Sequence, residues 1–169
     1  MSTSGTDADQ PGITHEATVH KAMDQLALDD NFPLFMTPNL DLNLSQLRPS
    51  PAYTFSLWQT YLDNVNPLLK VTHTPTLQAS IISAISNPDG IEPNLEALTF
   101  AMYCVAVLSL TEEECLTTYG AARSELLVRY QIACREALLR CRFLHSRSRD
   151  CLTALYLYLV SESPQTVVF

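Results

Sequence analysis

The segment spanning residues 98–110 is apolar almost all round and contains no charged side chain. A helix of this kind needs neighbours on several faces, so it is expected at the centre of a domain. The segment is too short to cross a bilayer, which takes about 20 apolar residues. The chain is therefore predicted to surround this segment with further helices.

Start and stop signals divide the rest of the sequence into such helices. Ser50 is a suitable N-cap, and Pro51 suits the first helical turn. Thr111 and Glu114 have the spacing of a capping box, and Gly120 is placed to end the helix that they begin. No strand alternation stands out. The prediction is an all-α fold of about six helices, over roughly residues 51–66, 74–86, 93–110, 111–119, 124–144 and 149–160.

Charge and composition change along the chain, whose formal net charge is -8. The first 50 residues hold seven acidic side chains and only two basic ones, Lys21 and Arg48. This composition predicts a disordered acidic tail and linker over residues 1–48, a domain over 49–162 and a C-terminal tail over 163–169. After Met23, acidic residues alternate with large apolar ones, as in activation segments. A linker that packs loosely on the domain is the interpretation we favour.

The cysteine pattern and the first ten residues indicate the cellular compartment of the protein. The first ten residues have neither a basic start nor an apolar run, so no signal peptide is predicted. Five cysteines, an odd number without Cys-x-x-Cys spacing, suggest a reducing compartment and free thiols. Cys104 is expected in the core. Cys115 lies near a helix N-terminus beside three acids, whose effect on the thiol opposes that of the helix dipole, so no special reactivity is expected.

Few residues suggest chemistry. Cys134 and Cys141 share a predicted helix face and could bind a metal with Cys151 and His145, but zinc sites usually include close ligand pairs, and buried thiols are the better interpretation. No Gly-rich phosphate loop, nucleophile elbow or His-Glu-x-x-His motif occurs in the sequence. The sequence therefore predicts no catalytic, cofactor-binding or metal-binding residue.

Three further patterns have an ordinary structural interpretation. His73 with Asp63 could suggest acid–base work, but His73 precedes a tight helix start, which favours a structural role. Seven arginines fall within residues 123–149, and we favour a solvated helix face over an anion- or partner-binding strip. Six aromatic residues at helical spacings are expected in the core rather than in a ligand cage: Trp58, Tyr61, Tyr103, Tyr130, Tyr156 and Tyr158.

Several collinear stretches resemble a known family. They are residues 49–68 (PSPAYTFSLWQTYLDNVNPL), 73–78 (HTPTLQ), 95–98 (LEAL), 113–115 (EEC), 129–130 (RY) and 152–155 (LTAL). Together they are similar to the fungal-specific transcription factor domain, the middle homology region of binuclear zinc cluster regulators. The resemblance spans roughly residues 49–161. It implies an α-helical, solenoid-like regulatory domain of nuclear proteins that control metabolic and secondary-metabolite genes, without catalytic residues.

The sequence departs from the family pattern in two ways. The family reads DNA with an N-terminal six-cysteine cluster that holds two zinc ions, whereas the first cysteine here is Cys104. Family members also continue for many helices beyond the segment that matches residues 152–161. We therefore expect the chain to be the first part of a larger domain, from a shortened gene, an alternative transcript or an imperfect gene model.

These observations predict a protein related to transcription regulation that acts through protein contacts, with a full-length transcription factor or by self-association. It is not expected to be an enzyme, to bind DNA sequence-specifically or to enter a membrane. Its predicted location is the nucleus, with the cytoplasm as the alternative. Because a fold does not determine a function, two alternatives stay open. One is a small enzyme or ligand-binding protein of secondary metabolism on the same scaffold, and the other is a non-functional fragment.

Overall fold

The computed structural model describes residues 42–162, apart from the side chain of Asp89, and this part of the chain is helical without a strand. Its α-helices are α2 (Leu44–Leu47), α3 (Pro51–Thr60), α4 (Asn66–Leu69), α5 (Thr74–Ser86), α6 (Pro93–Leu108), α7 (Glu112–Tyr119), α8 (Arg123–Arg140) and α9 (Arg149–Glu162). A π-helical segment, η1 (Tyr61–Val65), and two 3₁₀ turns, η2 (Pro88–Gly90) and η3 (Phe143–His145), join them. Six of the described helices have eight or more residues, so the predicted all-α fold of about six helices is confirmed.

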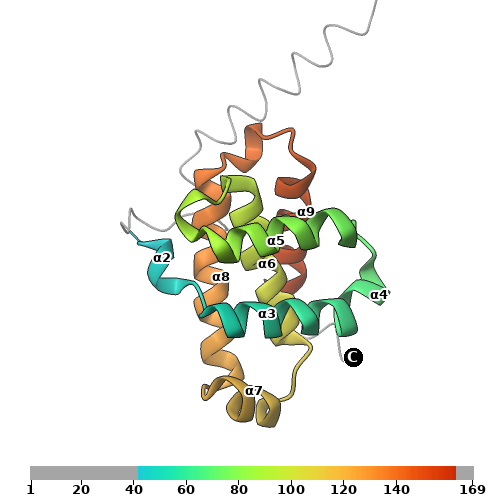
Figure 1. Cartoon of the computed structure of the whole chain (residues 1–169), viewed down its shortest axis with the longest axis vertical. Coiled ribbons are helices and arrows are strands. Elements are labelled where there is room, and N and C mark those ends of the chain that lie inside the picture. Colours follow the sequence, from blue (N-terminus) through green and yellow to red (C-terminus); the bar gives the residue numbers. More distant parts are fainter. Residues whose placement is uncertain (1–41, 163–169) are drawn as a thin grey trace, which may run out of the picture. The chain divides into compact units, whose positions relative to one another are not determined.

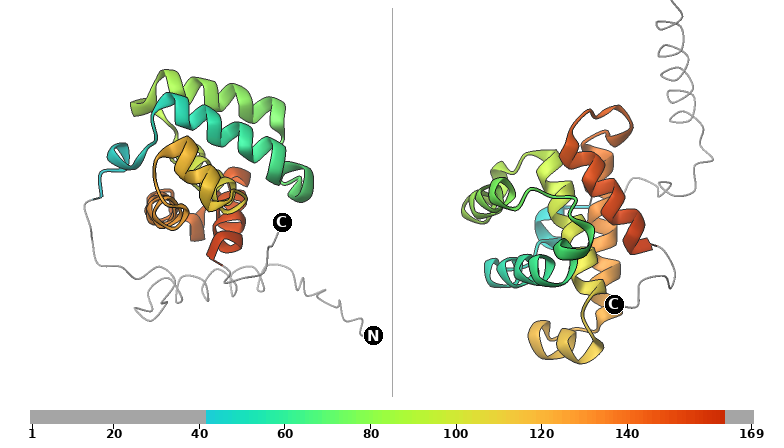
Figure 2. Two further views of the ribbon diagram at one scale, coloured as in Figure 1. Left: turned by 90° about the horizontal axis from the view of Figure 1, so that it is seen from below. Right: turned by 90° about the vertical axis from the view of Figure 1, so that its right-hand side faces the viewer.

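Helix α6 forms the centre of the described bundle, as its apolar sequence predicted. Every residue from 97 to 107 is buried. Helices α8 and α9 pack along one side of α6, while α3 and α5 lie next to each other across its other side (Figures 1 and 2). A helix with neighbours on both sides can bury an all-round apolar surface, which explains why this segment carries no charge.

Local capping signals set several helix ends. The Ser50 hydroxyl accepts a hydrogen bond from the Tyr53 N–H at 3.4 Å, at the start of α3. At the start of α7, the Thr111 hydroxyl accepts from the Glu114 N–H at 3.2 Å, and Glu114 Oε2 accepts from the Thr111 N–H at 2.7 Å. Gly120 ends α7 with a φ of 68°, a conformation that glycine adopts without a Cβ clash. The predicted capping box is thus present.

The chain remains helical beyond residue 66, the approximate end that the sequence predicted for this helix. The helix widens into η1, with the Asn66 N–H bonded to the Tyr61 carbonyl, and α4 follows. Lys70 ends this extension with a φ of 49°. Pro67 has no N–H to donate to a carbonyl of the preceding turn. The turn before it widens to the i→i−5 hydrogen bonds of a π-helix.

A short helix, α2, lies within the segment that the sequence analysis assigned to the linker. Asn43 caps it by accepting from the Ser45 N–H at 3.1 Å, and Leu44 is buried at 2% exposure. Two arginines of α8 hold this part of the chain: Arg129 donates to the Gln46 carbonyl at 3.2 Å, and Arg140 donates to the Leu42 carbonyl at 2.5 Å. The predicted domain limits at 48/49 and 162/163 stay predictions, because residues 1–41 and 163–169 lie outside the described part.

The expected aromatic core is present with one exception. Five of the six aromatic residues that were expected in the core are buried at 4% exposure or less: Trp58, Tyr61, Tyr103, Tyr130 and Tyr158. The prediction is wrong for Tyr156, which is 46% exposed on α9. Cys104 is fully buried, as expected. Among the described helices, none has both the length and the apolar character that crossing a membrane requires.

Candidate functional site

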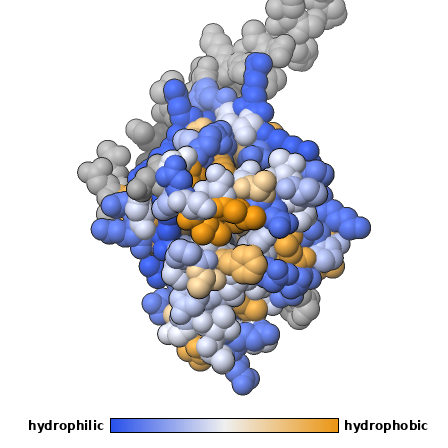
Figure 3. Space-filling view, in the orientation of Figure 1, coloured by the Kyte–Doolittle hydropathy of each residue, from blue (hydrophilic) through white to orange (hydrophobic). Residues whose placement is uncertain are grey.

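A cleft of about 290 Å³ lies between α3 and α5, above α6, and we call it the α3–α5 cleft. Hydrophobic side chains gather at the middle of the corresponding face of the molecule (Figure 3). The walls are mainly apolar, and the polar groups come from the chain around α2, from α3 and from α6. The lining residues are Ser45, Arg48, Pro49, Ser50, Pro51, Thr54, Ile81, Ala84, Ile85, Pro88, Ile91, Glu96, Thr99, Phe100 and Tyr103.

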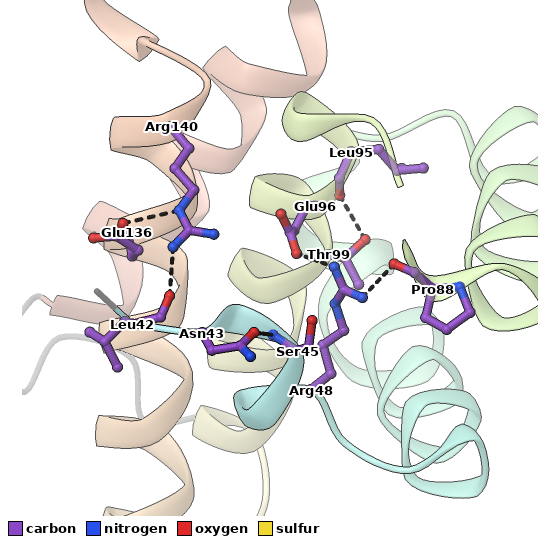
Figure 4. A network of polar contacts seen from close by, with 10 residues as sticks. All are labelled: Leu42, Asn43, Ser45, Arg48, Pro88, Leu95, Glu96, Thr99, Glu136 and Arg140. Atoms are coloured by element: carbon purple, nitrogen blue, oxygen red, sulfur yellow. Dashed lines mark hydrogen bonds and ion pairs between the residues drawn. The ribbon is translucent and has the colours of Figure 1, made fainter. Parts of the chain in front are cut away.

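Arg48 is the principal charged group of the cleft. Its Nη2 lies 2.5 Å from Glu96 Oε1, and its Nη1 donates to the Pro88 carbonyl (Figure 4). The two side chains are 20% and 12% exposed, so the pair is largely withdrawn from water. Arg48 Nε is buried and has no hydrogen-bond partner among the described residues. Sequence reasoning counted Arg48 only as one of two bases in an acidic segment and missed this role.

The other polar groups of the cleft are already engaged. The Thr99 hydroxyl donates to the Leu95 carbonyl at 2.7 Å, and the Thr54 hydroxyl donates to the Pro49 carbonyl at 3.5 Å. Burial raises the pKa of Tyr103, which keeps its phenol neutral. No His, Cys or Lys is among the lining residues. The cleft therefore has the features of a binding site, with mainly apolar walls and a few polar groups.

His73 and Asp63, which were considered as a possible acid–base pair, bond to different partners. Asp63 accepts hydrogen bonds from Gln59 Nε2 at 3.1 and 3.2 Å. His73 Nδ1 lies 2.8 Å from the Thr76 hydroxyl, and His73 lines a separate hollow with Arg149 and Asp150. The contact with Thr76 lies within the first turn of α5, which agrees with a structural role for His73.

The structure brings together two of the four residues that were considered as a metal site, Cys141 and Cys151, and Cys134 is buried as a thiol. Cys134 donates to the Ala97 carbonyl at 3.7 Å in the core, while the Cys141 sulfur lies 3.2 Å from that of Cys151. Burial raises the pKa of Cys141 to about 12 and also raises the pKa values of Cys115 and Cys134. Within residues 42–162, no three His, Cys, Asp or Glu side chains gather closely enough to hold a metal ion. The absence of bound zinc stays a prediction.

The thiols are expected to react slowly in the folded protein. Of the five, only Cys141 is partly exposed, and its pKa of about 12 leaves roughly one molecule in 10⁴ as thiolate at pH 8. Titration with an alkylating reagent such as iodoacetamide should modify one thiol, at least a hundredfold more slowly than free cysteine, because a thioether on Cys141, unlike a mixed disulfide, cannot be displaced by Cys151. Because pH 8–10 lies below this pKa, each added pH unit should raise the rate about tenfold. Cys141→Ser should abolish the reaction. After unfolding, five thiols should titrate in the wild-type chain and four in the variant. Rapid modification of two native thiols would contradict this.

Three of the seven arginines in residues 123–149 are tied to backbone carbonyls. Arg123 Nη2 donates to the Leu108 carbonyl at 2.6 Å, and Arg129 and Arg140 hold the α2 region as described above. Arg140 also pairs with Glu136 at 3.0 Å. The arginines of α8 are therefore not a uniform solvated face, because three of them connect α8 to other parts of the fold.

Helix α9 exposes an apolar stripe, which we call the α9 outer face. It consists of Leu152, Tyr156 and Leu159, at 56%, 46% and 41% exposure. The spacing of four and three residues places the three side chains along one side of the helix. The opposite side buries Cys151, Ala154 and Leu157 against the bundle. Among the described residues, the outer side of α9 is thus apolar and about half exposed.

Relatives of the chain are regulators of transcription in fungi. The chain is 50% identical, over 161 residues, to the transcriptional regulator AacuB of Aspergillus aculeatus, a match that covers 95% of the chain and 22% of AacuB. It is 40% identical over 135 residues to the aurofusarin cluster transcription factor aurR2 of Gibberella zeae, covering 74% of the chain and 20% of aurR2. The C6 finger domain transcription factor adaR of Aspergillus niger is 32% identical over 115 residues, covering 66% of the chain and 15% of adaR.

The chain thus spans about a fifth of the length of the curated relatives that it matches. No profile of a known protein family matches it, and no solved structure does.

Proposed function

Since the chain is homologous to fungal C6 zinc cluster transcription factors over part of their length, we propose that it regulates transcription in a secondary-metabolite pathway by contacting other proteins. The name of aurR2 links that relative to a biosynthetic cluster, and the proposal carries this link over to the chain. The relatives are named as regulators and not as enzymes, which supports a role without catalysis. We propose the nucleus as its location, because transcription factors act there.

The observation that carries the proposal is the α9 outer face. Burying an apolar side chain such as leucine gains about 1.5–3 kcal/mol, so three of them at one contact contribute several kcal/mol. Leu152 and Tyr156 are large and about half exposed, which is unusual for two neighbours on one helical stripe. An apolar helix face of another protein has the shape and chemistry to cover this stripe. A full-length transcription factor of the same family is the partner we propose.

A reporter experiment tests this role. The chain is fused to a heterologous DNA-binding domain in yeast, and reporter transcription is compared with that of the DNA-binding domain alone. We expect a change of at least threefold, in either direction. Leu152→Glu should abolish the change, because it places a charge in the apolar contact. The matched control is Leu116→Glu, at 52% exposure on α7, which should retain it. Equal effects of the two variants, or no effect of the fusion, would contradict the proposal.

We expect no sequence-specific DNA binding by these 169 residues. They contain no Cys-x-x-Cys pair, and their formal net charge is -8. Phosphate contacts need clustered basic side chains, and Arg123, Arg129 and Arg140 are engaged with backbone carbonyls. An electrophoretic mobility assay at physiological salt should show no band that withstands nonspecific competitor DNA. A shift at a defined site under these conditions would refute the expectation.

A further inference from the structure

We propose that Cys141 and Cys151 are a redox-responsive pair, which exchanges with a low-molecular-weight disulfide such as glutathione disulfide and closes into a reversible disulfide between α8 and α9. This inference goes beyond the proposed protein contacts and does not rest on them. The two sulfurs lie 3.2 Å apart, although the residues are ten positions apart in the sequence. A disulfide bond measures about 2.05 Å, so the sulfurs have to approach each other by only about 1 Å.

The two thiols differ in accessibility, which gives each of them a different role. Cys141 directly follows α8 and is partly exposed, whereas the other four cysteines, all within the described residues, are buried. Cys151 lies in the first turn of α9 at 0% exposure. A dissolved disulfide can reach Cys141 and not Cys151. Cys141 is therefore the thiol that attacks the dissolved disulfide, and Cys151 is the resolving thiol.

The exchange takes place in two steps. The Cys141 thiolate attacks one sulfur of glutathione disulfide, forms a mixed disulfide and releases the first glutathione thiolate. The Cys151 thiolate then attacks the Cys141 sulfur and displaces the second glutathione thiolate. The two protons that the cysteines lose go to the two released glutathione thiolates. Two protein thiols are thus oxidised to one disulfide, and one glutathione disulfide is reduced to two glutathione molecules.

The chain between the two cysteines has a fixed conformation, which keeps the sulfurs together. Arg142, with a φ of 50°, begins the turn after α8. Phe143 is buried at 8% exposure, and the Ser148 N–H donates to the Ser146 hydroxyl at 3.2 Å. Two groups that the fold already holds in contact react with each other much faster than either reacts with a molecule in solution. The mixed disulfide on Cys141 should therefore not accumulate.

The first step sets the pace of the exchange. Burial raises the pKa of Cys141 to about 12, so only a small fraction of this thiol is ionised near neutral pH. Uncatalysed disulfide exchange takes about minutes to hours even for ordinary thiols. The pair is therefore suited to a lasting shift of the balance between glutathione and its disulfide, and a short pulse of oxidant should leave it reduced.

Mass spectrometry of the full chain tests the proposal. The reduced chain is incubated at pH 8 with excess glutathione disulfide, quenched with acid, unfolded and alkylated. The product should be two hydrogen atoms lighter than the reduced chain and carry no glutathione, and three of the five thiols should remain. Trypsin should release residues 141–142 joined by a disulfide to residues 150–169. The bond should lower the unfolding equilibrium constant roughly a hundredfold, and dithiothreitol should reverse this change.

Variants separate the roles of the two thiols. Cys151→Ser should retain one glutathione, because Cys141 still attacks and no resolving thiol remains. Cys141→Ser should retain none, because Cys151 is out of reach. The matched control is Cys115→Ser, at the same 0% exposure as Cys151, which should form the disulfide as the wild-type chain does.

Three results on the wild-type chain would overturn the proposal, and they decide even where a variant does not fold. They are a stable mixed disulfide with glutathione, a disulfide that joins other cysteines or two chains, and an unchanged count of five thiols at equilibrium. Glutathione bound to a folded Cys141→Ser chain would also contradict the assigned order of attack.

Discussion

Replacement of Phe100 by alanine is expected to lower the free energy of unfolding by about 3–5 kcal/mol. Phe100 lies in α6, the central helix, at 2% exposure, and its ring meets that of Tyr103 edge-on, with centroids 5.9 Å apart. Its removal takes a buried ring out of the core and enlarges the α3–α5 cleft, which Phe100 lines. Typical domains have only about 5–15 kcal/mol of stability in total, so the variant should be partly unfolded under mild conditions.

Chemical denaturation followed by circular dichroism measures this loss. The matched control is Phe55→Ala, because Phe55 is 59% exposed on α3 and its removal should change the free energy of unfolding by no more than about 0.5 kcal/mol. The denaturant midpoint of the Phe100 variant should fall, with an unchanged slope of the transition. Similar midpoints for the two variants would show that α6 is not the centre of the folded core.

The parts of the fold that the sequence predicted are those with local causes. The capping box of α7 needs only Thr111 and Glu114, three residues apart, and Gly120 completes it. The central position of α6 follows from its own composition. The start of α3 follows from Ser50, which accepts from the Tyr53 N–H, and from Pro51, which has no N–H that needs an acceptor. Each of these signals acts within one or two turns of chain, so no knowledge of tertiary contacts was necessary.

The site could not be predicted because its contacts are distant in the sequence. Arg48 meets Pro88 and Glu96, which lie 40 and 48 residues further along the chain. Helix α2 is only four residues long, and burial of Leu44 against the bundle favours it more than any local pattern does. Cys141 was grouped with Cys134, Cys151 and His145, and the turn after α8, where Arg142 has a φ of 50°, brings one of them, Cys151, into contact with its sulfur. No pattern in the sequence predicts the cleft between α3 and α5.

The ion pair in the cleft is expected to be the second large contributor to stability. Arg48→Met should lower the free energy of unfolding by about 3–5 kcal/mol, because Glu96 would keep a largely buried charge without its partner. The double variant Arg48→Met with Glu96→Gln should recover much of this loss, since the uncompensated charge is then gone. The same loss should release α2, because Arg48 directly follows that helix and joins it to Pro88 and α6.

A second ion pair, between Arg140 and Glu136, provides the control for a double-mutant cycle on Arg48 and Glu96. Arg140 and Glu136 lie one turn apart on α8, at 44% and 24% exposure, and an exposed pair of this kind contributes about 0.3–0.5 kcal/mol. A double-mutant cycle by chemical denaturation should therefore give a coupling energy of about 2 kcal/mol or more for Arg48 with Glu96, and under about 0.5 kcal/mol for Arg140 with Glu136. The amide hydrogen-exchange rates of residues 44–48 should rise in Arg48→Met. In the double variant they should return toward the wild-type rates only if α2 packs on the bundle again. Equal coupling energies for the two pairs would mean that water screens the Arg48 site as fully as the surface of α8.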